Sequence, residues 1–215
     1  VEVGKDVTIP ELRNDGYKAF YVAVGCQGGR YPNIPNDHAE GTQTAVDFLK
    51  EANTGKCHFE DETVVVGGGN VAIDAARVSA RSGAKKVTML CLESKDIMPA
   101  SDEEIREAEE DGVVISCGWG PKEVVVEIGK ATAVIFKKCT RVYDENKKFS
   151  PLYDENETIT VPATKIIFAI GQSIEWGSLL EGTKVEYWHG NYPVADKLTY
   201  QTAEEDIFVG GDVYT

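Results

Sequence analysis

The chain has 215 residues, 42% of them hydrophobic, which is enough for one large domain or two small ones with a sizeable core. Its 36 acidic residues outnumber its 22 basic ones, and the net charge of −14 should repel nucleic-acid phosphates and anionic membrane surfaces. No apolar run approaches the roughly 20 residues of a bilayer helix, and the first residues lack the hydrophobic segment of a signal peptide. We therefore expect a cytoplasmic protein that binds neither nucleic acid nor membrane.

Residues suited to metal or thiol chemistry are scattered along the chain. The cysteines, at positions 26, 57, 91, 117 and 139, are odd in number and form no CxxC pair, which predicts reduced thiols rather than disulfides. His38, His58 and His189 lack the spacing of a zinc site, so no metal is expected. Cys57 beside His58 could suggest a nucleophile, but no third orienting group lies nearby in the sequence.

The first segment ends in a compact apolar run, Tyr17–Gly25, that predicts a buried strand closed by glycine. A loop rich in Gly, Pro, Asn and Asp follows at Cys26–Gly41, and Thr44–Asn53 has the spacing of a short amphipathic helix. Residues 26–61 are therefore predicted to link two folding units.

From Glu62 onward, strands and helices alternate. Short apolar strands are predicted at Thr63–Val66, Lys86–Leu92 and Val113–Cys117, and the helical segments between them end at Gly83 and Gly112. Ser101 and Glu104 have the spacing of a capping box at the start of the second helix. This order predicts an α/β fold, a Rossmann-like parallel sheet with helices on both faces.

After Gly120 the pattern changes to the alternation of antiparallel strands. Three strands are predicted, at 123–128, 131–143 and 157–163; Gly129-Lys130 joins the first two, and a polar stretch at 144–157 separates the last two. Lys165–Gly171 then supplies another buried strand that ends in glycine. We therefore expect an antiparallel β excursion from the parallel core.

The strongest motif is the glycine turn after the first strand of the parallel sheet. Gly67, Gly69 and Ala72 fit GxGxxG/A between a strand and a helix, with Gly68 in the same turn. The first glycine permits a tight turn, the second lets the backbone approach a pyrophosphate, and the small alanine lets the helix pack closely. Amides at the helix start, near Asn70 and Val71, would face the phosphates. The alternative is a glycine turn that binds nothing.

An acid follows the next strand, where a dinucleotide site holds the adenosine ribose. Glu93, followed by Ser94, lies 26 residues beyond Gly67, near the roughly 20 expected. A carboxylate accepts hydrogen bonds from the ribose hydroxyls of NAD and repels the 2′-phosphate of NADP, so NAD is the predicted cofactor. Lys95 keeps NADP open as a second choice, and Glu93 could instead be a solvated surface residue.

Two further features have ordinary structural explanations. The acidic cluster at 103, 104, 107, 109 and 110 has helical spacing, so a solvated helix face is favoured over metal or acid–base chemistry. Trp119 follows the third strand and could line a pocket, but the favoured role is to cap the core.

The ordered motifs VVVGGGNVAIDAAR, GAKKVTML, MPAS before a helix ending EEDGV, IIFAIGQ and IFVGGD resemble the NAD(P)-binding region of the glutamate synthase small subunit. That group belongs to the two-dinucleotide flavoprotein reductases, in which the NAD(P) domain is inserted into an FAD domain. NADPH-preferring members carry two arginines where this chain has Leu92 and Glu93, so the resemblance also favours NADH. Without a CxxC between the strands, thioredoxin-type disulfide chemistry is not implied.

The resemblance implies a division of the chain. Residues 1–56 would be a partial FAD-domain segment and linker, 57–170 the NAD(H)-binding domain, and 171–215 another partial FAD-domain segment. Gly171 would lie on the approach to the nicotinamide and flavin, and Asp212 would contact the FAD ribityl chain. The first glycine motif and the cysteine-rich iron–sulfur segment of the family are not in this sequence.

These features predict the NAD(H)-binding domain of an FAD-dependent oxidoreductase. Hydride would pass from NADH to FAD in the longer protein and electrons onward to an iron–sulfur segment or partner subunit, so we assign no catalytic side chain and expect no turnover from this chain alone. Two alternatives remain: an S-adenosylmethionine-dependent methyltransferase, which also pairs a glycine turn with an acid, and a non-catalytic NAD-sensing module.

Overall fold

The computed structural model describes residues 1–55 and 61–214, which form two compact units. One unit is Gly29–Gly171, and the other combines Val1–Gly28 with Gln172–Thr215. Residues 29–55 therefore belong with the glycine-turn region, whereas the sequence pattern predicted a linker there. The reason is β3 (Thr42–Thr44), which pairs with a strand of the parallel sheet, a long-range contact that local composition does not reveal.

A five-stranded parallel sheet forms the centre of the 29–171 unit. Its strands lie in the order β3–β10–β4–β5–β6, and all four pairings are parallel. The predicted strands are confirmed as β4 (Glu62–Val66), β5 (Lys86–Cys91), β6 (Val114–Cys117) and β10 (Lys165–Phe168). Because the strands are parallel, their carboxyl ends meet at one edge, where a ligand is expected.

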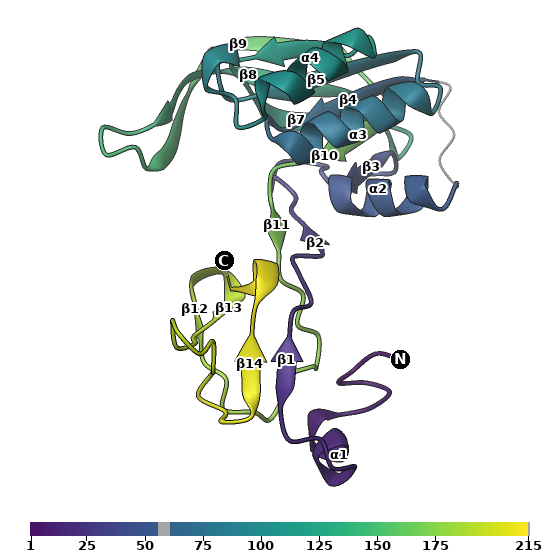
Figure 1. Ribbon diagram of the computed structural model, residues 1–215. Helices are drawn as coiled ribbons and strands as arrows, with labels where there is room; N and C mark the ends of the chain where they lie inside the picture. Colours follow the sequence, from purple (N-terminus) through teal and green to yellow (C-terminus); the bar gives the residue numbers. More distant parts are fainter. Residues whose placement is uncertain (56–60, 215) are drawn as a thin grey trace. The chain divides into compact units, whose positions relative to one another are not determined.

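The two faces of this sheet have different covers. Side chains alternate along each strand, so Val65 packs among the helices while Val64 and Val66 pack on the opposite side. Figure 1 shows α2 (Ala45–Asn53), α3 (Asn70–Arg81) and α4 (Asp102–Glu110) along one face. The other face is covered by an antiparallel sheet, which corrects the expectation of helices on both faces.

The antiparallel cover has three strands in the order β7–β8–β9. These strands are β7 (Trp119–Glu127), β8 (Lys130–Tyr143) and β9 (Phe149–Pro162). Ile128 and Gly129 have φ of 51° and 80° and join β7 to β8 in a tight turn, one residue before the predicted Gly129-Lys130 connection, because Lys130 already pairs with Glu127. The prediction that residues 144–157 are a loop between the last two strands is wrong in part, because β9 already begins at Phe149. The side chains in this part of β9 are mostly exposed, but its backbone still pairs with β8.

Side-chain caps begin α2 and α4, and the cap of α4 is the predicted Ser101. Thr44 caps α2 by accepting from the Asp47 amide at 3.3 Å, and Ser101 caps α4 by accepting from the Glu104 amide at 3.4 Å. The reciprocal half of the Ser101 capping box is not formed, and Glu104 Oε2 is buried without a partner among the described residues. The Arg77 guanidinium joins α3 to the end of α4 by binding Asp111 and Glu107.

The second unit is small and has its own apolar core. β1 (Phe20–Val22), shorter than the predicted strand, pairs in parallel with β14 (Ile207–Val209), and α1 (Ile9–Asn14) contributes Ile9 to the same core. Arg13 binds Asp206 through two nitrogens at 2.7 Å each. The remaining short elements are β2 (Gly28–Gly29), η1 (Lys95–Ile97), β11 (Gln172–Ser173), β12 (Tyr187–Trp188), η2 (His189–Asn191), β13 (Tyr192–Pro193) and η3 (Gly211–Val213).

Across residues 1–55 and 61–214, none of the helices combines the length and the apolar character needed to span a bilayer.

Candidate functional site

Gly67 begins the turn at the carboxyl end of β4. Its amide donates to the Leu90 carbonyl at 2.9 Å, and its φ of 146° lies in the region that favours glycine. A Cβ at this position would lie 2.3 Å from the carbonyl oxygen of Ala169, which follows the adjacent strand β10. The tight packing of two neighbouring strand ends therefore requires glycine here.

Gly68 is buried beneath the side chain of the predicted acid. A Cβ there would lie 2.9 Å from Glu93 Oε2 and 3.0 Å from Cys91 Cβ. The Gly68 carbonyl accepts from the Ala100 amide at 3.0 Å. The middle glycine thus leaves room for a carboxylate from the end of β5.

Gly69 precedes α3 with extended backbone and no side-chain cap. A Cβ on Gly69 would meet no atom within 4 Å. The carbonyl of Gly69 accepts from the amides of Ala72 and Ile73, whereas the amides of Asn70 and Val71 have no acceptor in the described part of the chain. Open space in front of unpaired amides at the start of a 12-residue helix fits a bound phosphate group.

The Asn70 side chain holds a neighbouring segment against the turn. Its Oδ1 accepts from the Ser101 amide at 3.2 Å, next to the bond between Ala100 and Gly68. The segment that leads into α4 is therefore fastened to the glycine turn at two successive residues.

Glu93 is not the solvated surface residue of the alternative interpretation, because it is only 8% exposed. Its main-chain oxygen accepts from the Gly118 amide at 2.9 Å, which ties together the ends of β5 and β6. Within residues 1–55 and 61–214, no hydrogen bond or ion pair to its carboxylate is found. The residue is mostly buried, but neither carboxylate oxygen is among the fully buried atoms without a partner, so the carboxylate reaches an opening and is available to the hydroxyl groups of a ligand.

The residues after Glu93 are turned outward. Ser94 is exposed at the start of η1, and its hydroxyl group lowers the pKa of Asp96 below the usual value by hydrogen bonding. Lys95 forms an ion pair with Glu109 of α4. Lys95, which kept NADP as a second choice of cofactor in the sequence analysis, is thus already paired.

Several residues near Glu93 were not found by sequence reasoning. Burial is the main cause that raises the pKa of the Cys139 thiol and of the Tyr153 phenol, and the charge of Glu93 adds to both. Burial likewise raises the pKa of Cys91, beside Cys117 on the next strand. Cys91, Cys139 and Tyr153 are therefore uncharged near neutral pH. Cys139 and Tyr153 lie on β8 and β9, and only tertiary pairing brings them to the site.

Gly171 and Asp212 are both exposed, and they belong to different units. Gly171 follows β10, has φ of 118°, and accepts from the Arg30 amide at 3.3 Å. It shares the carboxyl edge of the sheet with Gly67, because β10 and β4 are adjacent and parallel. Asp212 lies in η3 of the smaller unit, where its carbonyl accepts from the Cys26 thiol at 3.2 Å.

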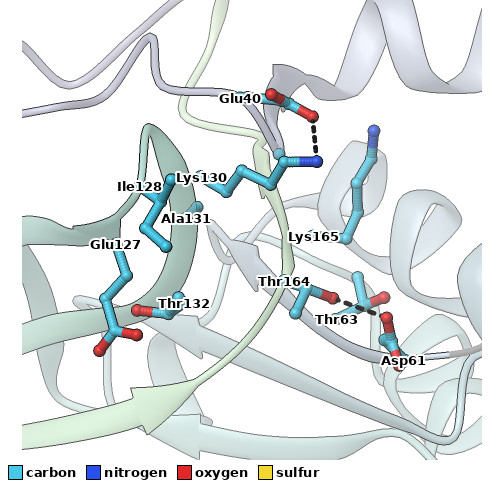
Figure 2. Close-up of a pocket in the computed structure, with 11 residues that line it drawn as sticks. Glu40, Asp61, Thr63, Glu127, Ile128, Lys130, Ala131, Thr132, Thr164 and Lys165 are labelled. Carbon is cyan, nitrogen blue, oxygen red and sulfur yellow. Dashed lines mark hydrogen bonds and ion pairs between the residues drawn. The ribbon is translucent and has the colours of Figure 1, made fainter.

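A cavity of about 720 Å³ lies at the opposite, amino-terminal end of the parallel strands. It is lined by Thr63 and Lys165 at the starts of β4 and β10 and by the β7–β8 turn around Ile128. Figure 2 shows two side-chain contacts in its lining, Lys130 to Glu40 at 2.9 Å and Thr164 to Asp61 at 3.4 Å. The cavity is therefore distinct from the glycine turn.

Other sequence candidates have structural roles. The ring of Trp119 packs on the core between the two sheets, as favoured from the sequence. The acidic residues of α4 form a helix face in which Glu107 and Glu109 pair with basic side chains. Residues 57 and 58 lie outside the described chain. In the part that is described, no group of three or more His, Cys, Asp or Glu side chains could hold a metal ion.

Comparisons with known proteins identify a family and relatives that match nearly the whole chain. A family model described as pyridine nucleotide-disulphide oxidoreductase matches residues 1–215. The chain is 31% identical over 219 residues to the NADP(+)-dependent formate dehydrogenase subunit beta of Moorella thermoacetica, covering 98% of this chain and 30% of that protein. It is 30% identical over 231 residues to the glutamate synthase [NADPH] small chain of Escherichia coli K12, covering 99% and 48%.

A similar fold is found in FprA from Mycobacterium tuberculosis in complex with NADPH, with a TM-score of 0.76 and 17% identity. That match covers 100% of this chain and 62% of the FprA chain. The chain thus spans about a third to a half of the two curated relatives named above.

Proposed function

Because the chain belongs to the pyridine nucleotide-disulphide oxidoreductase family, we propose that residues 29–171 are the NAD(H)-binding domain of an FAD-dependent oxidoreductase. The whole protein would resemble the glutamate synthase small subunit. The observation that carries this proposal is the placement of Glu93: a buried carboxylate that lies beside the second residue of a glycine turn.

The glycine turn would bind the pyrophosphate. The open space at Gly69 and the unpaired amides of Asn70 and Val71 fit an anion, and the positive end of the α3 dipole attracts it. Gly67 and Gly68 keep this position free of side chains. Asn70 also fastens Ser101, so the loop over the turn is fixed in place before a ligand binds.

Glu93 would accept hydrogen bonds from the adenosine ribose, with the exposed Ser94 beside it. An unpaired carboxylate favours the free 2′-hydroxyl of NADH over the charged 2′-phosphate of NADPH. This preference is proposed from this chain's own residues, since both relatives named above are described with NADP(+) or NADPH.

The smaller unit would contribute to an FAD site in the complete protein. Asp212 is exposed there and could bind a ribityl hydroxyl, and Gly171 would border the approach to the nicotinamide. When both cofactors are bound, the nicotinamide supplies a hydride and the flavin accepts it. The protein's part is to bind, orient and exclude water, so no acid or base is assigned. An iron–sulfur segment or partner subunit would receive the electrons.

The proposal is tested by titrating the purified protein with NADH, NADPH and S-adenosylmethionine, followed by NADH fluorescence and calorimetric heat. We expect NADH to bind most tightly. Heat with S-adenosylmethionine and none with either dinucleotide would show a methyltransferase-like site instead.

Dinucleotide binding alone does not separate a reductase from an NAD-sensing module. The test is reduction of bound FAD by NADH in the full-length protein, measured by loss of flavin absorbance. A flavin that stays oxidised under anaerobic NADH would favour the sensor.

A further inference from the structure

Main-chain hydrogen bonds bring the β7–β8 pair to the end of the parallel sheet beside Glu93. The Gly118 amide donates to the Glu93 carbonyl at 2.9 Å, and the Gly118 carbonyl accepts from the Cys139 amide, also at 2.9 Å. Three segments distant in the sequence thus meet at Gly118. The residue before Cys139 is Lys138, which faces Trp119 across the β7–β8 pair.

The Lys138 ammonium group lies at this junction. Its Nζ is 4.6 Å from the centre of the Trp119 ring and 3.5 Å from the place that a Cβ of Gly118 would take. The side chain is partly buried, so Trp119 holds it by a cation–π contact rather than leaving it to move in solvent.

Lys138 differs from its basic neighbours because it has no carboxylate partner among the described residues. Lys95 pairs with Glu109, and Lys137 pairs with Glu155 at 2.7 Å while lying over the Tyr153 ring. No ion pair of Lys138 is found within residues 1–55 and 61–214. Its charge is therefore available to a ligand.

Cys139 connects Lys138 to the Glu93 end of the sheet, because its amide donates to the Gly118 carbonyl and the Gly118 amide donates to the Glu93 carbonyl. Burial is the main cause that raises the pKa of Cys139; the negative charge of Glu93 raises it further, and the positive charge of Lys138 lowers it. The contacts at Gly118 thus place Lys138 and Glu93 in the same neighbourhood.

We propose that Lys138 is a second determinant of dinucleotide specificity, which attracts the 2′-phosphate of NADPH at the ribose end of the site. This inference rests on the proposed function. Glu93 favours the 2′-hydroxyl of NADH and repels a phosphate, while Lys138 offsets that repulsion. The site therefore accepts both dinucleotides, with NADH preferred by a margin that Lys138 keeps small.

The test is Lys138→Met, which removes the charge and keeps an unbranched apolar side chain over Trp119. The dissociation constants of NADH and NADPH are measured in the purified protein by fluorescence titration at low and high salt. We expect the NADPH constant to rise about fivefold, the weight of a modest charge pair, while the NADH constant stays within twofold. The NADPH effect should shrink at high salt.

Two further variants make the result specific. Lys137→Met removes the neighbouring charge and should leave the ratio of the two constants unchanged, because Lys137 is held by Glu155. Lys138→Arg keeps the positive charge and should therefore leave the NADPH dissociation constant close to that of the original protein. Equal weakening of both dinucleotides by Lys138→Met, or no change in the ratio, would overturn the inference while leaving the proposed function intact. Failure of the unmodified protein to bind either dinucleotide would instead overturn the proposed function.

Discussion

Glu93 Oε2 lies 2.9 Å from the position that a Cβ of Gly68 would occupy. The acid of the second strand and the glycine turn of the first are thus in direct contact, although 25 residues separate them in the sequence. The Gly68 carbonyl and the Glu93 carbonyl are both fixed by main-chain amides, from Ala100 and Gly118. The contact is therefore set by backbone packing and is present before any ligand binds.

Replacing Glu93 should change which dinucleotide is preferred. Glu93→Arg should raise the affinity for NADPH relative to NADH by about tenfold, because a guanidinium attracts the 2′-phosphate that the carboxylate repels. The measurement is the ratio of the two dissociation constants. Glu93→Gln has nearly the same shape without the charge and should narrow the ratio with less disturbance of this buried position. A ratio unchanged in both variants would mean that Glu93 does not touch the ribose.

Alanine substitutions of Gly68 and Gly69 should have different effects, one mainly on stability and the other mainly on NADH binding. Gly69→Ala adds a methyl group where no protein atom lies within 4 Å, so we expect a loss of stability below about 1 kcal/mol and NADH affinity lower by tenfold or more. Gly68→Ala places the methyl group against Glu93 and Cys91 and should cost about 1–3 kcal/mol of stability. Thermal unfolding and NADH titration of both variants check this. Normal NADH binding by Gly69→Ala would argue against a phosphate at the turn.

Replacing Thr63 with valine should stabilise the fold. Its side chain is 1% exposed, and its hydroxyl oxygen has no hydrogen-bond partner among the described residues. Thr63→Val keeps the shape and the strand preference but removes the unsatisfied group, so the free energy of unfolding should rise by about 1 kcal/mol. Chemical denaturation measures the change. Thr63→Ser, which keeps the hydroxyl, is the control and should be less stable than the original.

Acid should weaken the contact between α3 and α4. Arg77, and then Arg81, hold the pKa of Asp111 below its usual value, so this pairing stabilises the fold above the unfolded-state pKa of about 4 and is lost as the pH falls through the lower folded value. Arg77→Met should lower the melting temperature at neutral pH and reduce its further fall below pH 4. Arg106→Met is the control, since its carboxylate partner Glu110 is 4.0 Å away and exposed. Identical acid profiles for Arg77→Met and the original protein would contradict this role.

The local part of the fold could be read from the sequence. Apolar runs bounded by glycine or charge identified the central strands, and Thr44 and Ser101 marked helix starts, because these signals act between residues close in the chain. The same locality explains two errors. The last antiparallel strand begins at Phe149, and β3 joins the parallel sheet, because backbone pairing with a distant strand overrides polar composition.

The candidate site divides in the same way. The sequence by itself determined the glycine turn, the acid after the second strand and hence the expectation of a dinucleotide, since motif spacing fixes these positions along a strand, turn and helix. Only the tertiary structure decided that Glu93 is buried against Gly68, that an antiparallel sheet covers the second face, and that Lys138 lies beside Gly118. Glu93 and Gly68 are 25 positions apart in the sequence, and Lys138 and Gly118 are 20 apart. Such contacts cannot be predicted from the periodicity within a single helix or strand.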